Sequence, residues 1–129
     1  MRIGFTGTRR GMSTLQAFQL RAQLIKLGAT EFHHGDCLGA DSDAHAVAKE
    51  LGILIYIHPP SDSKLRAYNK GFKHYFPLPY LECNHAIVDT TELLIAAPSS
   101  MTAERRSGTW ATVRYAIKQN KPIHLLEVK

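Results

Sequence analysis

The sequence predicts an α/β protein: a single Rossmann-like, three-layer domain with a mostly parallel five-stranded sheet and helices on both faces. Three observations lead to this prediction. Apolar stretches with strand character alternate along the chain with stretches of helical periodicity. The strand candidates are largely apolar, which is typical of strands buried on both faces of a parallel sheet. The chain has 129 residues, 44% hydrophobic and 21% charged, which fits one soluble globular domain over residues 1–129.

The first strand and helix have clear boundaries. Residues 2–6 form a short, mostly apolar stretch that ends in a Thr-Gly-Thr turn, as a strand would. Ser13 then offers a helix N-cap, with Gln16 three residues later completing a capping box. Apolar residues recur at helical spacing up to Gly28, which is a favourable helix stop. A strand–turn–helix unit is therefore expected at the start of the chain.

The later elements repeat this alternation. We expect strands over residues 30–34, 53–57, 93–97 and 122–128, and helices over residues 40–51, 80–90 and 109–120. Residues 61–78 are polar, basic and aromatic without a period, which indicates a long excursion, and such loops are usually functional or mobile. The aromatic side chains of this excursion form an oligomer contact, a lid or a cover for the core: Tyr68, Phe72, Tyr75 and Phe76.

Composition and short motifs exclude several classes of protein. No apolar run approaches the about 20 residues of a transmembrane helix, and the N-terminus reads as a strand rather than a signal peptide. Cys37 and Cys83 form no CxxC motif, so we expect a cytoplasmic protein with reduced thiols. No zinc-binding spacing occurs among the seven histidines, and we expect neither a metal nor a resident cofactor. Nucleic acid is not the expected partner of this basic chain (net charge +5), because its basic residues are distributed among glycine-containing loops that suit a small phosphate ligand better.

Three loops, each between an expected strand and helix, are the candidate ligand site, because parallel sheets bind ligands outside the carboxyl ends of their strands. The first contains Thr6, Gly7, Thr8 and Arg9. Glycine lets a ligand approach the backbone, N–H groups at a helix start attract anions, and arginine can pair with phosphate. The alternative is a tight turn with solvated arginines.

The second and third loops have a similar composition. Gly35, Asp36, Gly39 and Asp41 suggest a backbone cradle with carboxylates for ribose hydroxyls, although Asp41 can equally be a helix N-cap. The third loop places basic and small residues before a helix, which favours an anion site: Arg105, Arg106, Ser107, Gly108 and Thr109. Trp110 either stacks on a base or packs in the core or against another subunit. His58 follows the third expected strand and is placed as a pocket residue, whereas Cys37 is interpreted as a packed thiol rather than a nucleophile.

Together these segments resemble the SLOG superfamily, the Rossmann-like fold shared by DprA-type and LOG-type proteins. The resemblance spans nearly the whole chain and rests on five segments in order: Gly4-Phe5-Thr6-Gly7-Thr8-Arg9; His34-Gly35-Asp36-Cys37-Leu38-Gly39-Ala40-Asp41; His58-Pro59-Pro60; Pro79-Tyr80-Leu81 with Asn84 and Ile87-Val88; and Ser107-Gly108-Thr109-Trp110-Ala111-Thr112-Val113-Arg114. It implies a nucleotide-derived ligand at the carboxyl ends of the strands. LOG-type members hydrolyse the N-glycosidic bond of nucleoside monophosphates, whereas other members only bind or sense nucleotides, including antiphage defence signals.

The sequence departs from the LOG-type pattern at both catalytic positions. The Arg-Lys pair early in the helix before the fourth strand reads Cys83-Asn84, and the glutamate of Gly-Thr-x-x-Glu reads Thr112. Cleavage of a glycosidic bond needs a carboxylate, which Thr112 cannot supply. We therefore expect no catalytic residue and a protein that binds its ligand without turning it over. The alternative is a nucleotide N-glycosidase or phosphoribohydrolase-like enzyme that uses Asp36.

The predicted function is capture of an ADP-ribose derivative, a cyclic nucleotide or a mononucleotide for sensing or sequestration, for example of a defence signal by a phage or prophage protein. A DprA-like binder of single-stranded nucleic acid ranks last. A homo-oligomer is expected, because the resemblance implies dimers. The predicted ligand-binding residues are Thr6, Gly7, Thr8, Arg9, Gly35, Asp36, Gly39, Asp41, His58, Pro59, Asn84, Arg105, Arg106, Ser107, Gly108, Thr109 and Trp110.

Overall fold

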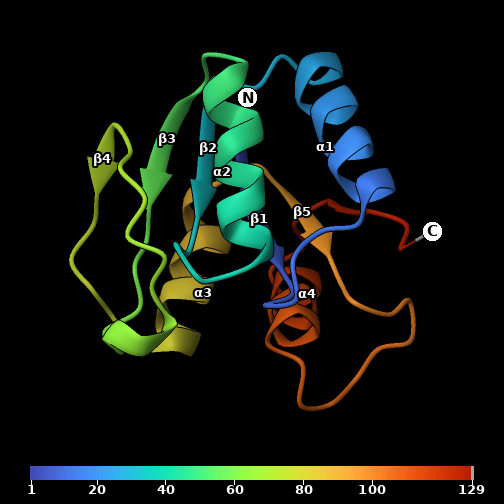
Figure 1. Cartoon of the computed structure of the whole chain (residues 1–129). Helices are drawn as coiled ribbons and strands as arrows, with labels where there is room; N and C mark the ends of the chain where they lie inside the picture. Colours follow the sequence, from blue (N-terminus) through green and yellow to red (C-terminus); the bar gives the residue numbers. More distant parts are fainter. Residues whose placement is uncertain (129) are drawn as a thin grey trace.

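A six-stranded, entirely parallel sheet forms the centre of the computed structural model, which describes residues 1–128 (Figure 1). The strands lie in the order β4-β3-β2-β1-β5-β6. Their bounds are β1 Arg2–Gly7, β2 Glu31–His34, β3 Leu54–Ile57, β4 Lys73–His74, β5 Leu93–Ala97 and β6 Ile123–Leu125. The predicted α/β class is confirmed, and the predicted number of five strands is wrong.

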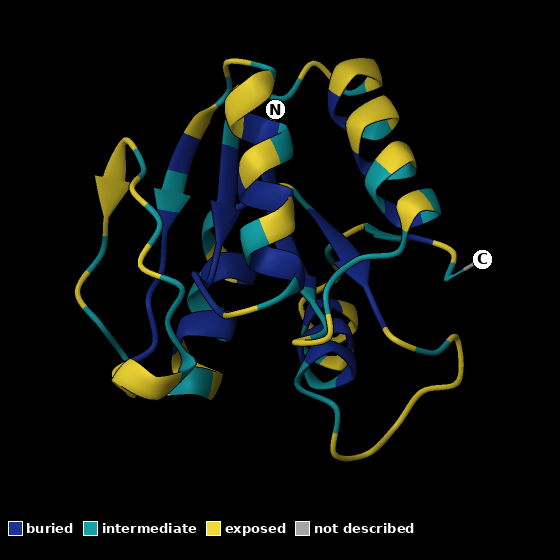
Figure 2. Ribbon diagram, viewed as in Figure 1, coloured by how far each residue is buried: buried dark blue, intermediate teal, exposed yellow. Residues whose placement is uncertain are grey.

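Helices cover both faces of this sheet. Four α-helices occur within residues 1–128: α1 Thr14–Lys26, α2 Ala40–Glu50, α3 Tyr80–Thr90 and α4 Gly108–Lys118. Helices α1 and α2 lie over one face and α3 and α4 over the other (Figure 1). The buried apolar side chains form two clusters that match these layers. Phe5, Leu20 and Phe32 belong to the first, and Ile87 and Val113 to the second. Figure 2 shows that buried positions concentrate in the central strands, whereas each helix alternates buried and exposed positions.

The missed strand, β4, has only two residues and lies at the edge of the sheet. It pairs with Tyr56 and Ile57 of β3. Lys73 and His74 are both polar and exposed, so the sequence there has no apolar alternation to mark a strand. The pairing depends instead on the position of the edge of β3, which the sequence does not show. A short 3₁₀ helix, η1 Ser63–Leu65, precedes it in the excursion.

The ends of the elements follow the local sequence closely. Ser13 accepts the backbone N–H of Gln16, and the Gln16 side chain accepts the N–H of Ser13, so the predicted capping box is present. Strand β6 ends at Leu125, earlier than expected, and the chain then turns toward α1, where Glu127 N donates to Gln19 Oε1 at 2.9 Å. None of the helices within residues 1–128 is long and apolar enough to cross a membrane.

Candidate anion-binding site

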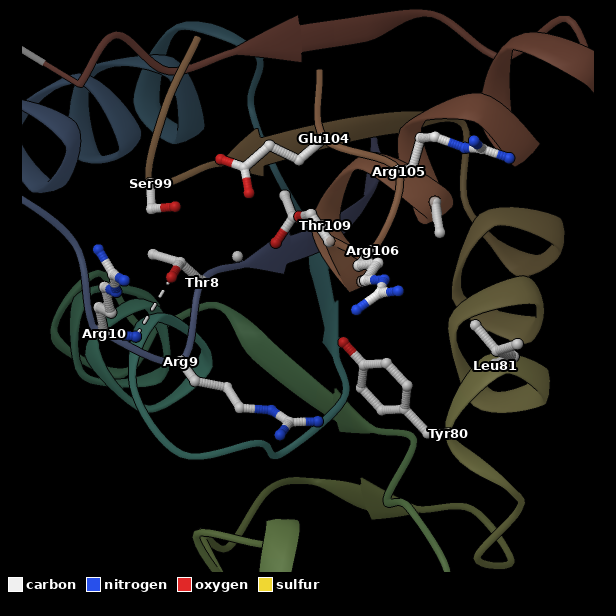
Figure 3. Close-up of a pocket in the computed structure, with 14 residues that line it drawn as sticks. Thr8, Arg9, Arg10, Tyr80, Leu81, Ser99, Glu104, Arg105, Arg106 and Thr109 are labelled. Atoms are coloured by element: carbon white, nitrogen blue, oxygen red, sulfur yellow. Dashed lines mark hydrogen bonds between the residues drawn. The ribbon is translucent and has the colours of Figure 1, made fainter. Parts of the chain in front are cut away.

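A cavity of about 600 Å³ opens beyond the carboxyl ends of β1 and β5. These strands pair in register up to Gly7 opposite Ala97, so the loops that follow them lie next to each other. The cavity, here called the anion pocket, also includes the start of α3 and the first turn of α4 (Figure 3). Its lining consists of Gly7, Thr8, Arg9, Arg10, Tyr80, Leu81, Ser99, Glu104, Arg105, Arg106, Ser107, Gly108, Thr109 and Ala111.

Positive charge dominates the anion pocket. Four arginines line it, whereas Glu104 is the one carboxylate in its lining over the described part of the chain. Arg9 and Arg106 point toward Tyr80, and Arg105 points away from the middle of the pocket (Figure 3). The Arg9 guanidinium carbon lies 5.4 Å from the centre of the Tyr80 ring. An anion between Arg9 and Arg106 would relieve the repulsion between their guanidinium groups and pair with both.

Helix α4 contributes its N-terminus to the anion pocket. The N-cap Ser107 accepts the Trp110 N–H through Oγ at 3.2 Å and the Ala111 N–H through its carbonyl at 2.9 Å. The N–H groups of Gly108 and Thr109, the first two residues of α4, have no acceptor among residues 1–128. A Cβ at Gly108 would stand 2.1 Å from the Tyr80 hydroxyl, so only glycine permits this packing. Two free backbone donors therefore lie beside the arginines, an arrangement that favours phosphate.

The loop between β2 and α2 contacts the β1–α1 loop and fixes the position of its backbone. Ala40 N donates to Thr8 O at 2.9 Å, and Thr8 N donates to Ala97 O at 3.0 Å. Gly39 has a φ of +92°, and a Cβ there would stand 2.2 Å from the carbonyl oxygen of Arg9. Gly39 therefore positions Arg9 without lining the anion pocket itself.

The anion pocket brings together about half of the predicted ligand-binding residues: Gly7, Thr8, Arg9, Arg105, Arg106, Ser107, Gly108 and Thr109. The sequence prediction missed Arg10, Tyr80, Leu81, Ser99, Glu104 and Ala111. Arg10, Ser99 and Glu104 lie in or beside the predicted loops, so their position was a usable signal. Tyr80 and Leu81 enter through the placement of α3. Both belong to a segment that carries the family resemblance, which was the usable signal, although neither was among the predicted ligand-binding residues.

Asp36 is fully buried and lies outside the lining of the anion pocket. Its carboxylate accepts the backbone N–H of Asn69 at 2.9 Å, the Asn69 side-chain N–H at 3.2 Å and the Arg66 Nε–H at 3.4 Å. The Ala67 N–H donates to the Asp36 carbonyl at 2.8 Å. Asp36 therefore fastens residues 66–69 of the excursion to the β2–α2 loop, and these contacts occupy the oxygens that the sequence analysis assigned to ribose hydroxyls. We refer to this set of contacts as the Asp36 clamp.

The other predicted ligand-binding residues also lie outside the lining of the anion pocket: Thr6, Gly35, Gly39, Asp41, His58, Pro59, Asn84 and Trp110. Asp41 is not the N-cap of α2, which is Gly39; its carboxylate accepts the N–H groups of Gly35 and Cys37 at 3.2 and 3.1 Å. Trp110 packs in the core beside Val113, and its indole N–H donates to Ser100 O at 3.3 Å. Asn84 is buried, and its side-chain nitrogen has no partner among residues 1–128.

The cysteines and histidines are buried in ways that limit their chemistry. Burial raises the pKa of the Cys37 thiol well above its usual range and that of Cys83 to about 12, so neither thiol is an activated nucleophile. His34 accepts the Asp36 N–H through Nδ1 at 2.9 Å, and its Nε2 lies 2.9 Å from His45 Nδ1. Burial lowers the pKa of His34 to about 3, so this contact joins two neutral rings at neutral pH. Within residues 1–128, no group of three or more His, Cys, Asp or Glu side chains is placed to hold a metal ion.

Acidification is expected to destabilise the fold. Burial lowers the pKa of His34 and of His58 to about 3, so below the unfolded-state pKa of about 6.5 the unfolded chain binds more protons and stability falls with pH. Burial raises the pKa of Asp41 to about 7, which has the opposite effect over the same interval. The two histidines lower stability on acidification and the one carboxyl raises it, so the net effect is that of one proton. The free energy of unfolding is therefore expected to fall by about 1.4 kcal/mol per pH unit between about pH 6 and 4. His33 and His45, whose pKa values burial also lowers, add to this loss.

Urea unfolding at several pH values measures this loss. The variant Asp41→Asn removes the opposing proton and is expected to steepen the fall, whereas His124→Gln, on β6, should leave the slope unchanged. A free energy of unfolding that stays flat from pH 7 to pH 4 would contradict the neutral, buried state of His34 and His58.

This chain is similar to known proteins in its three-dimensional structure, but not in comparisons of sequence. No family model matches the sequence, and no curated protein matches it. A molybdenum cofactor binding protein from Rippkaea orientalis superposes with a TM-score of 0.71 and 24% identity, over 95% of this chain and 74% of that one. The Moco carrier protein of Chlamydomonas reinhardtii superposes with a TM-score of 0.68 and 23% identity, over 96% of this chain and 74% of that one.

DNA processing protein A (DprA) from Streptococcus pneumoniae gives a TM-score of 0.71 and 17% identity, over 96% of this chain. This chain spans only 49% of that DprA chain, about half its length. The Rossmann-like fold that the sequence resemblance implied is thus supported by the three-dimensional structure. These likenesses, each below 25% identity, show that the chain shares its fold with these proteins.

Proposed function

We propose that this protein binds a nucleotide-derived, phosphate-bearing small molecule in the anion pocket and does not turn it over. One observation carries the proposal: Arg9 and Arg106, from loops nearly a hundred residues apart in the chain, point toward the same space at the N-terminus of α4. Two convergent guanidinium groups and two free N–H donors match a phosphate group, which has several acceptor oxygens and negative charge.

The size and surroundings of the anion pocket support a small-molecule ligand. Its volume of about 600 Å³ lies within the range of about 300–1,000 Å³ of ordinary small-molecule sites. A mononucleotide, a cyclic nucleotide or an ADP-ribose derivative is of suitable size and charge. Structural relatives described as a molybdenum cofactor binding protein and a Moco carrier protein provide precedent for small-molecule binding on this fold. We infer a role in sensing or sequestering such a ligand in the cytoplasm, for example a defence signal.

The position of the carboxylates favours binding over glycosidic cleavage. Such cleavage needs a carboxylate beside the reacting carbon. Asp36, the residue that the enzyme alternative needs, is held by Arg66 and Asn69 outside the anion pocket. Glu104 lies in the β5–α4 loop and points toward Ser99 in Figure 3. Within residues 1–128 no second carboxyl group lines the anion pocket, whereas glycosidases ordinarily use two.

The Arg106→Ala variant is expected to weaken ligand binding by about 1.5–3 kcal/mol, because it removes a charge-assisted pair. Arg9→Ala should have an effect of the same size. The control is Arg21→Ala on α1, which removes an equally charged side chain that pairs with Glu50 at 3.2 Å far from the anion pocket. Native mass spectrometry against mononucleotides, cyclic nucleotides and ADP-ribose derivatives identifies the ligand, and calorimetry then gives the affinities.

Each result of this experiment has a clear meaning. A ligand recovered intact in fixed ratio to protomers supports the proposal and also measures the oligomeric state. A ligand recovered as base plus sugar phosphate makes the protein an N-glycosidase. Affinity that grows with strand length and falls steeply with salt makes it a single-strand nucleic acid binder. Unchanged affinity in both arginine variants removes the anion pocket from consideration.

A further inference from the structure

A second cavity, of about 210 Å³, lies between α3 and the end of the excursion. It shares no lining residue with the anion pocket, and its lining is His58, Tyr75, Phe76, Leu78, Cys83, Ala86 and Thr90. Phe76 is 84% exposed. We call this cavity the apolar cavity.

Among the buried side chains that line the apolar cavity, His58 keeps a polar atom without a partner in residues 1–128. The hydroxyl of the half-buried Tyr75 also has none there. The Cys83 thiol donates to Tyr80 O at 3.0 Å, and the Thr90 hydroxyl donates to Ala86 O at 2.7 Å, so α3 satisfies both. The Tyr75 ring stacks on the His58 ring, with centroids 4.2 Å apart. This stacking fixes the orientation of the imidazole.

A hydrogen-bonded chain sets the proton positions of His58. Glu31 Oε1 lies 2.9 Å from His33 Nε2, and His33 Nδ1 lies 2.8 Å from His58 Nε2. A carboxylate only accepts, so His33 carries its proton on Nε2 and accepts through Nδ1. His58 must then carry its proton on Nε2, which leaves Nδ1 as a lone-pair acceptor with no partner among residues 1–128. Burial lowers the pKa of both histidines, which keeps both rings neutral at neutral pH.

We propose that the apolar cavity binds a small aromatic molecule, of one ring or two fused rings, that donates a single O–H or N–H to His58 Nδ1. The volume suits such a ring system, and the mainly apolar lining with one buried, oriented acceptor disfavours ligands with several polar groups or a negative charge. This inference does not depend on the function proposed for the anion pocket, because the two cavities share no residue.

The test compares phenol and indole with toluene, which has similar size but no donor. Nitrogen-15 NMR of histidine-labelled protein is expected to show phenol shifting the His58 Nδ1 resonance while the His34 signals stay in place. Phenol should bind about three- to tenfold more tightly than toluene, the value of one net hydrogen bond. The cavity-filling variant Ala86→Leu should abolish binding of both probes, and it leaves the Glu31–His33–His58 chain intact. His58→Phe should remove the difference between phenol and toluene.

Two outcomes would overturn the inference. Equal binding of phenol and toluene, or no change at His58 Nδ1 at saturation, would show that the acceptor does not recognise a ligand. A concentration-dependent dimer in sedimentation that Ala86→Leu dissociates, together with no binding of phenol or indole, would show that a second copy of the chain covers this cavity. Arg106→Ala serves as the matched control and should bind phenol as the unmodified protein does.

Discussion

Replacing Asp36 with alanine is expected to lower the free energy of unfolding by about 3 kcal/mol, because the Asn69 donors lose their acceptor and the partly exposed Arg66 loses its counter-charge. The carboxylate is fully buried, and it accepts hydrogen bonds from Asn69 and Arg66. The residue also has a φ of 53°, a left-handed conformation that aspartate tolerates better than alanine. Urea unfolding followed by circular dichroism measures the loss.

Two further variants separate the Asp36 clamp from a ligand role. Asp36→Asn keeps the left-handed preference and an oxygen for Asn69 but loses the charge that faces Arg66, so we expect an intermediate loss. Asp62→Ala alters an exposed residue of the same excursion and should change stability by less than about 0.5–1 kcal/mol. If Asp36→Ala unfolds at the same urea concentration as the unmodified protein but no longer binds nucleotide, the carboxylate serves the ligand after all.

The Gly39→Ala variant is expected to lose both stability and ligand affinity. The added Cβ would stand 2.2 Å from the carbonyl oxygen and 2.4 Å from the carbonyl carbon of Arg9, and a backbone cannot yield as a side-chain tip can. The left-handed φ of +92° adds a strain of about 1–2 kcal/mol. The β1–α1 loop must move, and Arg9 with it. We expect a total loss above about 2 kcal/mol in unfolding and at least a tenfold loss in affinity.

Gly28→Ala provides a matched control for Gly39→Ala. Gly28 also has a left-handed φ, +61°, but a Cβ there meets nothing within 4 Å. This variant therefore carries the backbone strain alone, about 1 kcal/mol, and should keep full affinity. Equal losses of stability in the two variants, with unchanged affinity in Gly39→Ala, would show that the contact between Gly39 and Arg9 is not what positions the arginine.

Most of the fold could be predicted because its signals are local. Ser13 and Gln16 mark the start of α1, and strands such as β5, with Leu94 and Ile95 buried, are apolar from end to end. Strand β4 lacked such a signal, since Lys73 and His74 are exposed and polar. It exists because β3 offers an open edge, which is a property of the assembled sheet.

The candidate site was predicted in part for the same reason. Arg9 and Arg106 lie in loops that follow strands, and the geometry of parallel sheets brings such loops together. The role of Asp36 was hidden, because its partner Asn69 comes 33 residues later in a segment without a period. A carboxylate beside glycines looks the same in the sequence whether it faces a ligand or an internal arginine. Tyr80 entered the site through the packing of α3 against Gly108, a contact between distant parts of the chain.

The loop between β5 and α4 is fastened mainly at its flanks. The indole of Trp110 holds Ser100 O at 3.3 Å, and Arg114 holds the carbonyl oxygens of Glu104 and Arg105 at 3.4 and 3.2 Å. Both anchors belong to α4, and the stretch between them is exposed. Because loop closure costs rise slowly with length, segments of other lengths can be grafted here without disturbing the core. This loop is therefore a natural site for evolution or engineering to change ligand choice while the scaffold stays constant.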